Sequence, residues 1–124
     1  MPINSKRKGK RGELELVQFL KDHGLDAERS VQYKGRADSA DVICPALPHV
    51  HFENKCTERT DLYGWIEQAV KDSGGHGTPV VTHKKNRKEF LAIMTLEDFI
   101  RWAIIVENHQ RSLEADPDAA LLGE

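Results

Sequence analysis

The order of hydrophobic patterns along the chain constrains its fold most strongly, because one helix-like stretch lies between strand-like stretches. Apolar residues recur at helical spacing from Leu62 to Val70, after an alternating run at 50–56. Two further β-prone runs follow at 79–83 and 90–94. A helix that connects two strands of one sheet is a crossover, which makes those strands parallel. The pattern therefore predicts an α/β fold with a central mixed β-sheet flanked by helices.

The first half of the chain has one helical and three extended patterns. Apolar side chains at positions 16, 17 and 20 predict a helix that starts near Glu13 and ends near Gly24. Strands are expected at 27–33, 41–44 and 50–56, and their short links favour an antiparallel meander. A last helix begins at Leu96. The expected element order is α-β-β-β-α-β-β-α.

Length and composition limit the class of protein. The 124 residues suffice for one domain, and 39% hydrophobic with 31% charged residues is a globular composition. No apolar run is long enough for a membrane span, and the start of the chain lacks the apolar region of a signal peptide. We expect an intracellular, cytoplasmic protein with Cys44 and Cys56 as free thiols.

Charge is distributed unevenly along the chain. Residues 1–12 hold five basic residues and no acidic one, whereas residues 109–124 hold four acidic residues and one arginine. We expect a basic flexible arm at 1–12, a folded domain at 13–108 and a flexible acidic tail at 109–124. Basic clusters attract polyanions such as DNA, although a solvated tail is the simpler alternative. The candidate DNA-binding residues are Lys6, Arg7, Lys8, Lys10, Arg11, Arg59, Lys84, Lys85 and Arg87.

Three acidic residues and one lysine are the candidates for chemistry. Glu53 and Lys55 are two residues apart on a predicted strand, so their side chains share one face. If the preceding strand pairs with this one, Asp41 lies beside Glu53. Two adjacent carboxylates require a cation, and Mg²⁺ favours oxygen ligands of this type. Glu13 adds a third acid on the apolar stripe of the first helix, where it needs a partner.

Such a site favours phosphodiester hydrolysis. Mg²⁺ held by few carboxylates keeps water molecules and engages substrate phosphates, and we expect Mn²⁺ to substitute for it. Lys55 is normally a cation at neutral pH, so it suits charge stabilisation better than general-base catalysis. Gln68, on the following helix, has an amide that could orient the attacking water.

The chain resembles the PD-(D/E)XK nuclease superfamily, and more narrowly the small Holliday junction resolvases of the archaeal and phage type. The resemblance rests on Ala40-Asp41-Val42, Glu53-Asn54-Lys55, Glu13, Gln68, the segment 7–16 and Glu28-Arg29-Ser30. It runs from about Lys6 to about Trp102. It implies a restriction-endonuclease-like αβββαβ core in a nuclease domain at 13–108, Mg²⁺-dependent endonuclease activity and a homodimer. A phage-encoded member would act in the host cytoplasm.

The resemblance also implies roles for individual residues. Asp41, Glu53 and the backbone carbonyl of Asn54 would be metal ligands, with Glu13 at or near the metal. Lys55 would be the catalytic lysine, Gln68 a helper, and Ser30 a neighbour of the scissile phosphate. Two departures stand out: Ala40 replaces the proline of the superfamily name, and Asp38 is a competing carboxylate.

Three functions remain open at this stage. The first is a homodimeric, Mg²⁺-dependent, structure-selective endonuclease that cuts branched DNA at four-way junctions, with Trp102 and Ile105 on the dimer surface. The second is a restriction-like or nicking nuclease on other DNA, and the third a non-catalytic DNA-binding module. No nucleotide cofactor is expected, because the glycine-rich segment 74–77 lacks the Lys-Ser/Thr of a phosphate loop.

A zinc site is a further alternative. Two thiols and two imidazoles form a tetrahedral set, and the chain offers Cys44, His49, His51 and Cys56. Their spacing argues against zinc, because both histidines lie between widely separated cysteines. We expect buried thiols and exposed histidines instead.

Overall fold

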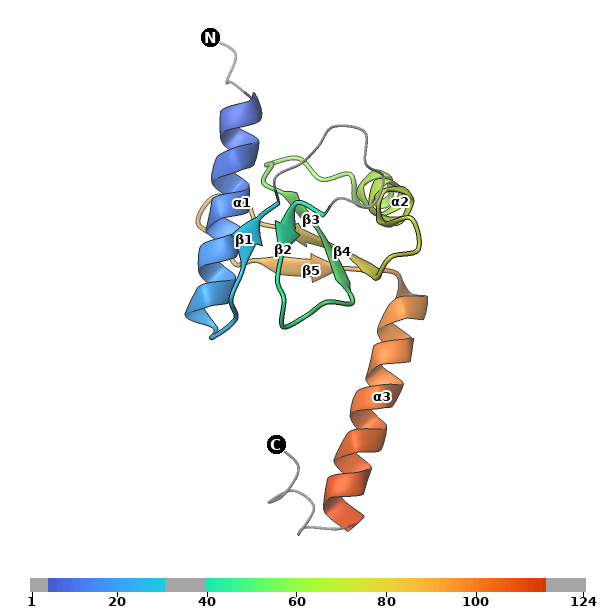
Figure 1. Ribbon diagram of the computed structural model, residues 1–124. Coiled ribbons are helices and arrows are strands. Elements are labelled where there is room, and N and C mark those ends of the chain that lie inside the picture. Colours follow the sequence, from blue (N-terminus) through green and yellow to red (C-terminus); the bar gives the residue numbers. More distant parts are fainter. Residues whose placement is uncertain (1–4, 31–39, 116–124) are drawn as a thin grey trace. The chain divides into compact units, whose positions relative to one another are not determined.

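The computed structural model describes residues 5–30 and 40–115 of the chain (Figure 1). Within these residues it confirms the predicted element order. The elements are α1 (Ser5–Asp22), β1 (Glu28–Arg29), β2 (Val42–Ile43), β3 (Val50–Lys55), α2 (Leu62–Ser73), β4 (Thr78–His83), β5 (Leu91–Ile93) and α3 (Leu96–Ala115).

The five strands form one mixed sheet in the order β1-β2-β3-β4-β5. β1, β2 and β3 are antiparallel neighbours, as the short links between them predict. β3 and β4 are parallel and are connected through α2, so the expected crossover is confirmed. β5 pairs antiparallel with β4 at the edge.

Each face of the sheet is covered by one helix. Leu16, Val17 and Leu20 of α1 are buried against a face formed by Val42 and Phe52. On the opposite face, Trp65 and Ala69 of α2 pack on Val81. Figure 1 shows α1 and α2 on different sides of the sheet. Because side chains alternate along β3, Glu53 and Lys55 lie on the α2 face and Phe52 lies on the α1 face.

The ends of α2 have clear local causes. The side chain of Asp61 accepts a hydrogen bond from the backbone N–H of Gly64 and caps the first turn. Gly74 adopts a left-handed conformation at φ 55° and closes the last turn through its N–H to the carbonyl of Lys71. The predicted stop at Gly74-Gly75 is therefore confirmed, and the caps fix where the chain leaves and rejoins the sheet.

Two predicted boundaries are wrong. Residues 5–12, expected in a flexible arm, belong to α1, because lysine and arginine are good helix formers and the two glycines do not break the helix. α3 continues to Ala115, past the predicted end at Asn108, through further helix-favouring residues. Part of the first predicted strand and Asp38 lie in 31–39, outside the described residues.

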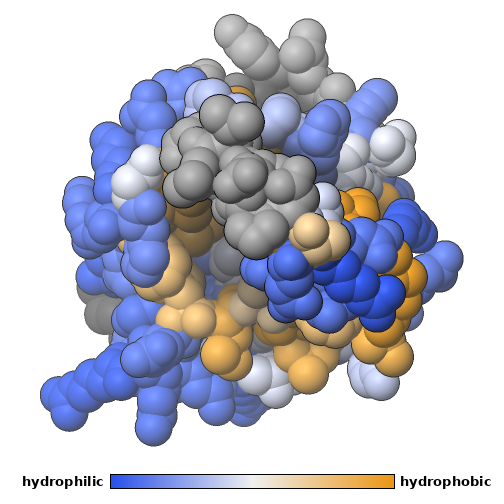
Figure 2. Space-filling model, turned by 90° about the horizontal axis from the view of Figure 1, so that it is seen from below, coloured by the Kyte–Doolittle hydropathy of each residue, from blue (hydrophilic) through white to orange (hydrophobic). Residues whose placement is uncertain are grey.

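The chain divides into two compact units, residues 1–94 and 95–124. The first contains the sheet with α1 and α2, and thus every candidate catalytic residue. The second contains α3, whose exposed apolar side chains are Leu96, Phe99, Ile100, Ile104, Ile105 and Val106. Exposed hydrophobic side chains are visible among hydrophilic ones in Figure 2. Over the described part of the chain, we find no helix with the length and apolar character of a membrane span.

Candidate active site

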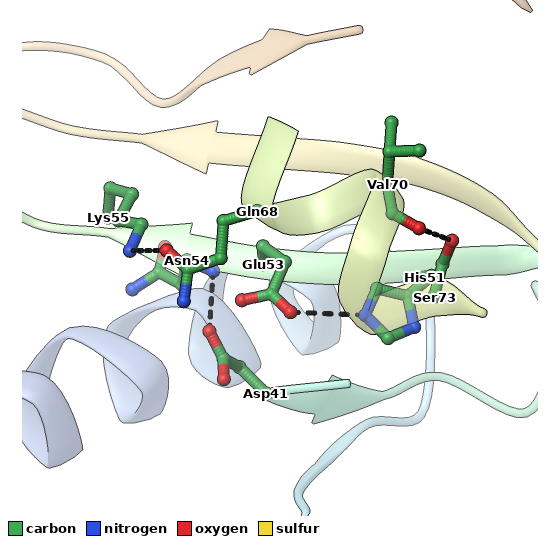
Figure 3. Close-up of polar contacts among 8 residues, drawn as sticks. All are labelled: Asp41, His51, Glu53, Asn54, Lys55, Gln68, Val70 and Ser73. Atoms are coloured by element: carbon green, nitrogen blue, oxygen red, sulfur yellow. Dashed lines mark hydrogen bonds and ion pairs between the residues drawn. The ribbon is translucent and has the colours of Figure 1, made fainter. Parts of the chain in front are cut away.

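The two central acids lie on adjacent strands. Val42 is paired with Phe52, so continuing this antiparallel register by one residue sets Asp41 beside Glu53. The backbone N–H of Asp41 donates to the carbonyl of Phe52 at 2.9 Å. Its carboxylate Oδ2 accepts from the backbone N–H of Asn54 at 2.8 Å (Figure 3). The structure therefore brings Asp41 to the strand that carries Glu53 and Lys55, as the sequence predicts.

Glu53 is a buried carboxylate in an unfavourable electrostatic setting. Its exposed fraction is only 5%, and burial is the main cause that raises its pKa above the ordinary value. Repulsion from Asp41 and Asp72 raises the pKa further, whereas a hydrogen bond with His51 lowers it. A cation near Glu53 and Asp41 would relieve both the burial cost and the repulsion.

Lys55 and Gln68 are brought together from two elements. Lys55 ends β3 on the α2 face, and its Nζ donates to Oε1 of Gln68 at 3.2 Å (Figure 3). Gln68 lies midway along α2, so the helix that caps at Asp61 sets the position of the amide. The amide holds the ammonium group at the same end of β3 as the two acids.

Glu13 approaches the site from α1. Its Oε1 accepts from Nε of Arg29 at 2.8 Å, with both side chains partly buried. Burial is the main cause that raises the pKa of Glu13; Arg29 lowers the pKa, and repulsion from Asp41 raises it. The partner required by this half-buried acid is therefore a guanidinium. Asp41 is close enough to both acids to raise the pKa of Glu13 and of Glu53.

Gly12 allows α1 to come close to β3. A Cβ atom at this buried position would meet Cβ of Cys56 at 2.9 Å and Nδ2 of Asn54 at 3.0 Å. Real Cβ atoms essentially never show a contact as short as the one to Cys56, and the contact to Asn54 is also tight. The missing side chain thus lets the helix carry Glu13 to the end of the strand that holds Glu53.

Ser30 continues the same cross-strand row. Arg29 pairs with Val42, and the backbone N–H of Ser30 donates to the carbonyl of Asp41 at 3.0 Å. The structure therefore brings the predicted Ser30 beside Asp41. Asp38, the competing carboxylate, lies outside the described residues.

The donor set fits a magnesium ion better than zinc. Among the described residues, no group of three or more His, Cys, Asp and Glu side chains could hold a metal. Mg²⁺ needs only one or two carboxylates, because water and substrate complete its octahedral shell. Asp41 and Glu53, on adjacent strands, are two such carboxylates, and the expected third oxygen ligand is the backbone carbonyl of Asn54. Cys44 instead lies buried in the core, as expected for a thiol.

Several predicted DNA-binding residues gather in one groove. Lys8, Arg11 and Lys84 line a pocket of about 290 Å³ together with two acids, Glu15 and Glu58. Lys84 pairs with Glu15 at 3.6 Å, so the cations of this pocket are partly balanced. A second pocket, of about 220 Å³, shares Lys8, Cys56 and Thr57 and extends to Lys55. The side chain of Lys6 is outside the described part, and the remaining candidates, Arg7, Lys10, Arg59, Lys85 and Arg87, are exposed outside these two pockets.

Sequence reasoning missed two residues of this site. His51, expected to be exposed, has an exposed fraction of 3% and contacts Glu53 through Nε2 at 3.1 Å. Its position two residues before Glu53 on a strand was the available signal, because 51, 53 and 55 share a face. Arg29 lies in a motif of the resemblance but was not assigned to the site; its pairing depends on which face of β1 meets α1.

PD-(D/E)XK nucleases have an αβββαβ core that presents an acid and a Glu-X-Lys motif on adjacent strands. This chain has that core, with Asp41 as the acid and Glu53 and Lys55 in the motif. The chain belongs to one family of this superfamily, described as "Phage putative PDDEXK endonuclease", which matches residues 4–114. Neither the curated proteins nor the solved structures gave a significant match.

Proposed function

We propose that this chain is a Mg²⁺-dependent endonuclease that hydrolyses phosphodiesters at four-way DNA junctions. The observation that carries the proposal is the set at the end of β3, where Glu53 and Lys55 share a face and Asp41 joins them from β2. Membership of the chain in a family of endonucleases supports phosphodiester hydrolysis. The choice of a branched substrate rests on the sequence resemblance to junction resolvases.

Asp41, Glu53 and the backbone carbonyl of Asn54 would hold the metal. When bound, Mg²⁺ supplies a more acidic water molecule and offsets negative charge on the phosphate, and Mn²⁺ would do the same. Glu53 is pre-positioned for this task, because the fold buries its carboxylate near a second one. Glu13, on α1, adds negative charge close to Asp41 at the edge of the metal site.

Lys55 acts on the phosphate group that is cleaved. Its ammonium group lies at the end of β3, where it can donate to the phosphate oxygens as negative charge develops on them. The amide of Gln68 restrains the flexible lysine side chain and leaves two ammonium protons for the substrate. Fixing the cation before reaction reduces the reorganisation that the transition state requires.

The groove from Lys55 to Lys84 would bind the DNA backbone. Its cations, Lys8, Arg11 and Lys84, come from α1 and from the link after β4, which are far apart in sequence. Contacts of this kind go to phosphates and carry no sequence information. Such a surface suits an enzyme that recognises the shape of branched DNA.

A dimer would match the symmetry of the substrate. A four-way junction offers two equivalent strands, and a two-fold dimer presents one site to each. The exposed apolar side chains of α3, including Ile105, with the half-buried Trp102, are the proposed contact surface. Analytical ultracentrifugation should give a dimer at micromolar concentration, and a monomer there would contradict this part of the proposal.

The substrate test compares a labelled four-way junction with a linear duplex of identical sequence. We expect cleavage of the junction in Mg²⁺, cleavage in Mn²⁺, and none in EDTA. The variant Asp41→Asn should bind the junction without cutting it. Equal cleavage of the duplex would favour a restriction-like or nicking nuclease, and binding without any metal-dependent cleavage would favour a non-catalytic module.

A further inference from the structure

The buried histidine of β3 has no role in the function proposed so far. His51 lies on the α2 face, two residues before Glu53, and both side chains are almost fully buried. Its Nε2 lies 3.1 Å from Oε1 of Glu53 (Figure 3). In the ionised form that binds a metal, the carboxylate only accepts hydrogen bonds, so Nε2 is the donor to Oε1 in that form. The contact therefore places a donor on one oxygen of a proposed metal ligand.

The two oxygens of Glu53 have different surroundings. Oε1 faces His51, whereas Figure 3 shows the other carboxylate oxygen pointing away from the imidazole. A carboxylate held at one oxygen has its plane fixed, because its last torsion is otherwise broad. The second oxygen then stays available for a cation. The same hydrogen bond stabilises the ionised form that a metal requires.

Among the described residues, the neighbouring groups do not share the task of holding the carboxylate of Glu53. The nearby Ser73 of α2 donates its Oγ to the carbonyl of Val70 at 2.9 Å (Figure 3). Asp72 acts on Glu53 only by repulsion. The other buried histidine of this face, His83, bonds to the backbone carbonyl of Thr57 through Nε2, and its ring packs at a tilt of 47° against Trp65.

We infer that His51 is a positioning residue, which fixes the carboxylate of Glu53 by one hydrogen bond so that its second oxygen binds the divalent metal. The inference rests on the proposed function, because it requires Glu53 to be a metal ligand. Groups that orient metal ligands in this way typically change metal affinity or activity by about 10–100-fold when they are removed.

The test measures binding of Mn²⁺ by electron paramagnetic resonance, without DNA and without turnover. His51→Phe keeps an aromatic ring but removes the donor, and should weaken Mn²⁺ binding by about 10–100-fold. His51→Gln offers an amide N–H near the position of Nε2 and should restore most of the affinity. His51→Asn has the same amide on a shorter side chain and should bind as weakly as the phenylalanine variant.

His83→Phe is the matched control, because it removes a buried imidazole of the same face that bonds to the backbone carbonyl of Thr57 and, within the described residues, not to an acid. Its Mn²⁺ affinity should equal that of the wild type. If His51→Phe does not fold, the difference between glutamine and asparagine decides the question. Equal Mn²⁺ affinity for all His51 variants, or a loss in His83→Phe as large as that in His51→Phe, would overturn this inference but not the proposed function. A wild-type protein without Mn²⁺ binding would overturn the proposed function with it.

Discussion

Glu53→Gln should make the metal-free protein more stable, although it removes a catalytic group. The glutamate is 5% exposed, and its charge is opposed by burial and by two other acids. Desolvation costs an ionised group several kcal/mol, and the hydrogen bond from His51 returns about 1.5–3 kcal/mol. Glutamine has the same shape and can still accept that bond. We therefore expect a net gain of about 1–2 kcal/mol in EDTA at pH 8.

The gain should depend on pH in a defined direction. Burial raises the pKa of Glu53 above its ordinary value of 4.5, so the folded state binds this proton more tightly than the unfolded state. The stability that Glu53 gains from this tighter proton binding is complete below about pH 4.5 and is lost as the pH rises through the folded-state pKa. The stability advantage of the variant should thus be absent at pH 4 and fully developed at pH 8.

Thermal unfolding in EDTA across this pH range is the assay, with exposed Glu28→Gln as the control. For a unit of this size, 1 kcal/mol shifts the melting temperature by about 4–8 °C. When EDTA is replaced by Mg²⁺ at ten times its Kd, the wild type should be stabilised by about 1.4 kcal/mol and the variant should be unchanged. A variant that is less stable than the wild type at pH 8 would refute the reasoning, because Glu53 would then be a structural acid.

Three further predictions concern the surroundings of the site. Gly12→Ala should lower the melting temperature, because overpacking costs about 1–3 kcal/mol, whereas Gly9→Ala, in open space, should raise it. Gln68→Ala should slow single-turnover cleavage about fivefold with unchanged Mn²⁺ affinity, since one hydrogen bond to the lysine is worth about 1 kcal/mol. Arg11→Ala should reduce the slope of log K against log salt in DNA binding by about 1, and exposed Lys21→Ala should leave it unchanged.

Much of the fold was predictable because its elements have different hydrophobic periods. The helical spacing from Leu62 to Val70, set between strand-like runs, required the crossover that the structure contains. The pairing of Asp41 with Glu53 was predictable for a local reason: the short link at 45–49 leaves an antiparallel neighbour as the simplest arrangement. Such features depend on short-range geometry, which a sequence expresses directly.

The remainder depended on long-range contacts. The basic run at 5–12 has the composition of a solvated arm, and its helical state involves the close approach of Gly12 to β3. Similarly, the choice of Arg29 as the partner of Glu13 requires α1 and β1 to meet on one face. The alternation along β3 puts His51 on the face of Glu53, but its burial also requires coverage by α2, which is a long-range contact.

Single-turnover cleavage of labelled junction DNA, comparing the wild type with Glu53→Gln in Mg²⁺ and in EDTA, tests the catalytic assignment most directly. We expect the wild type to cut only in the presence of the metal. The variant should bind the DNA with wild-type affinity and fail to cut it under either condition. Cleavage by the variant at the wild-type rate, or cleavage by the wild type in EDTA, would contradict a metal-dependent role for this carboxylate.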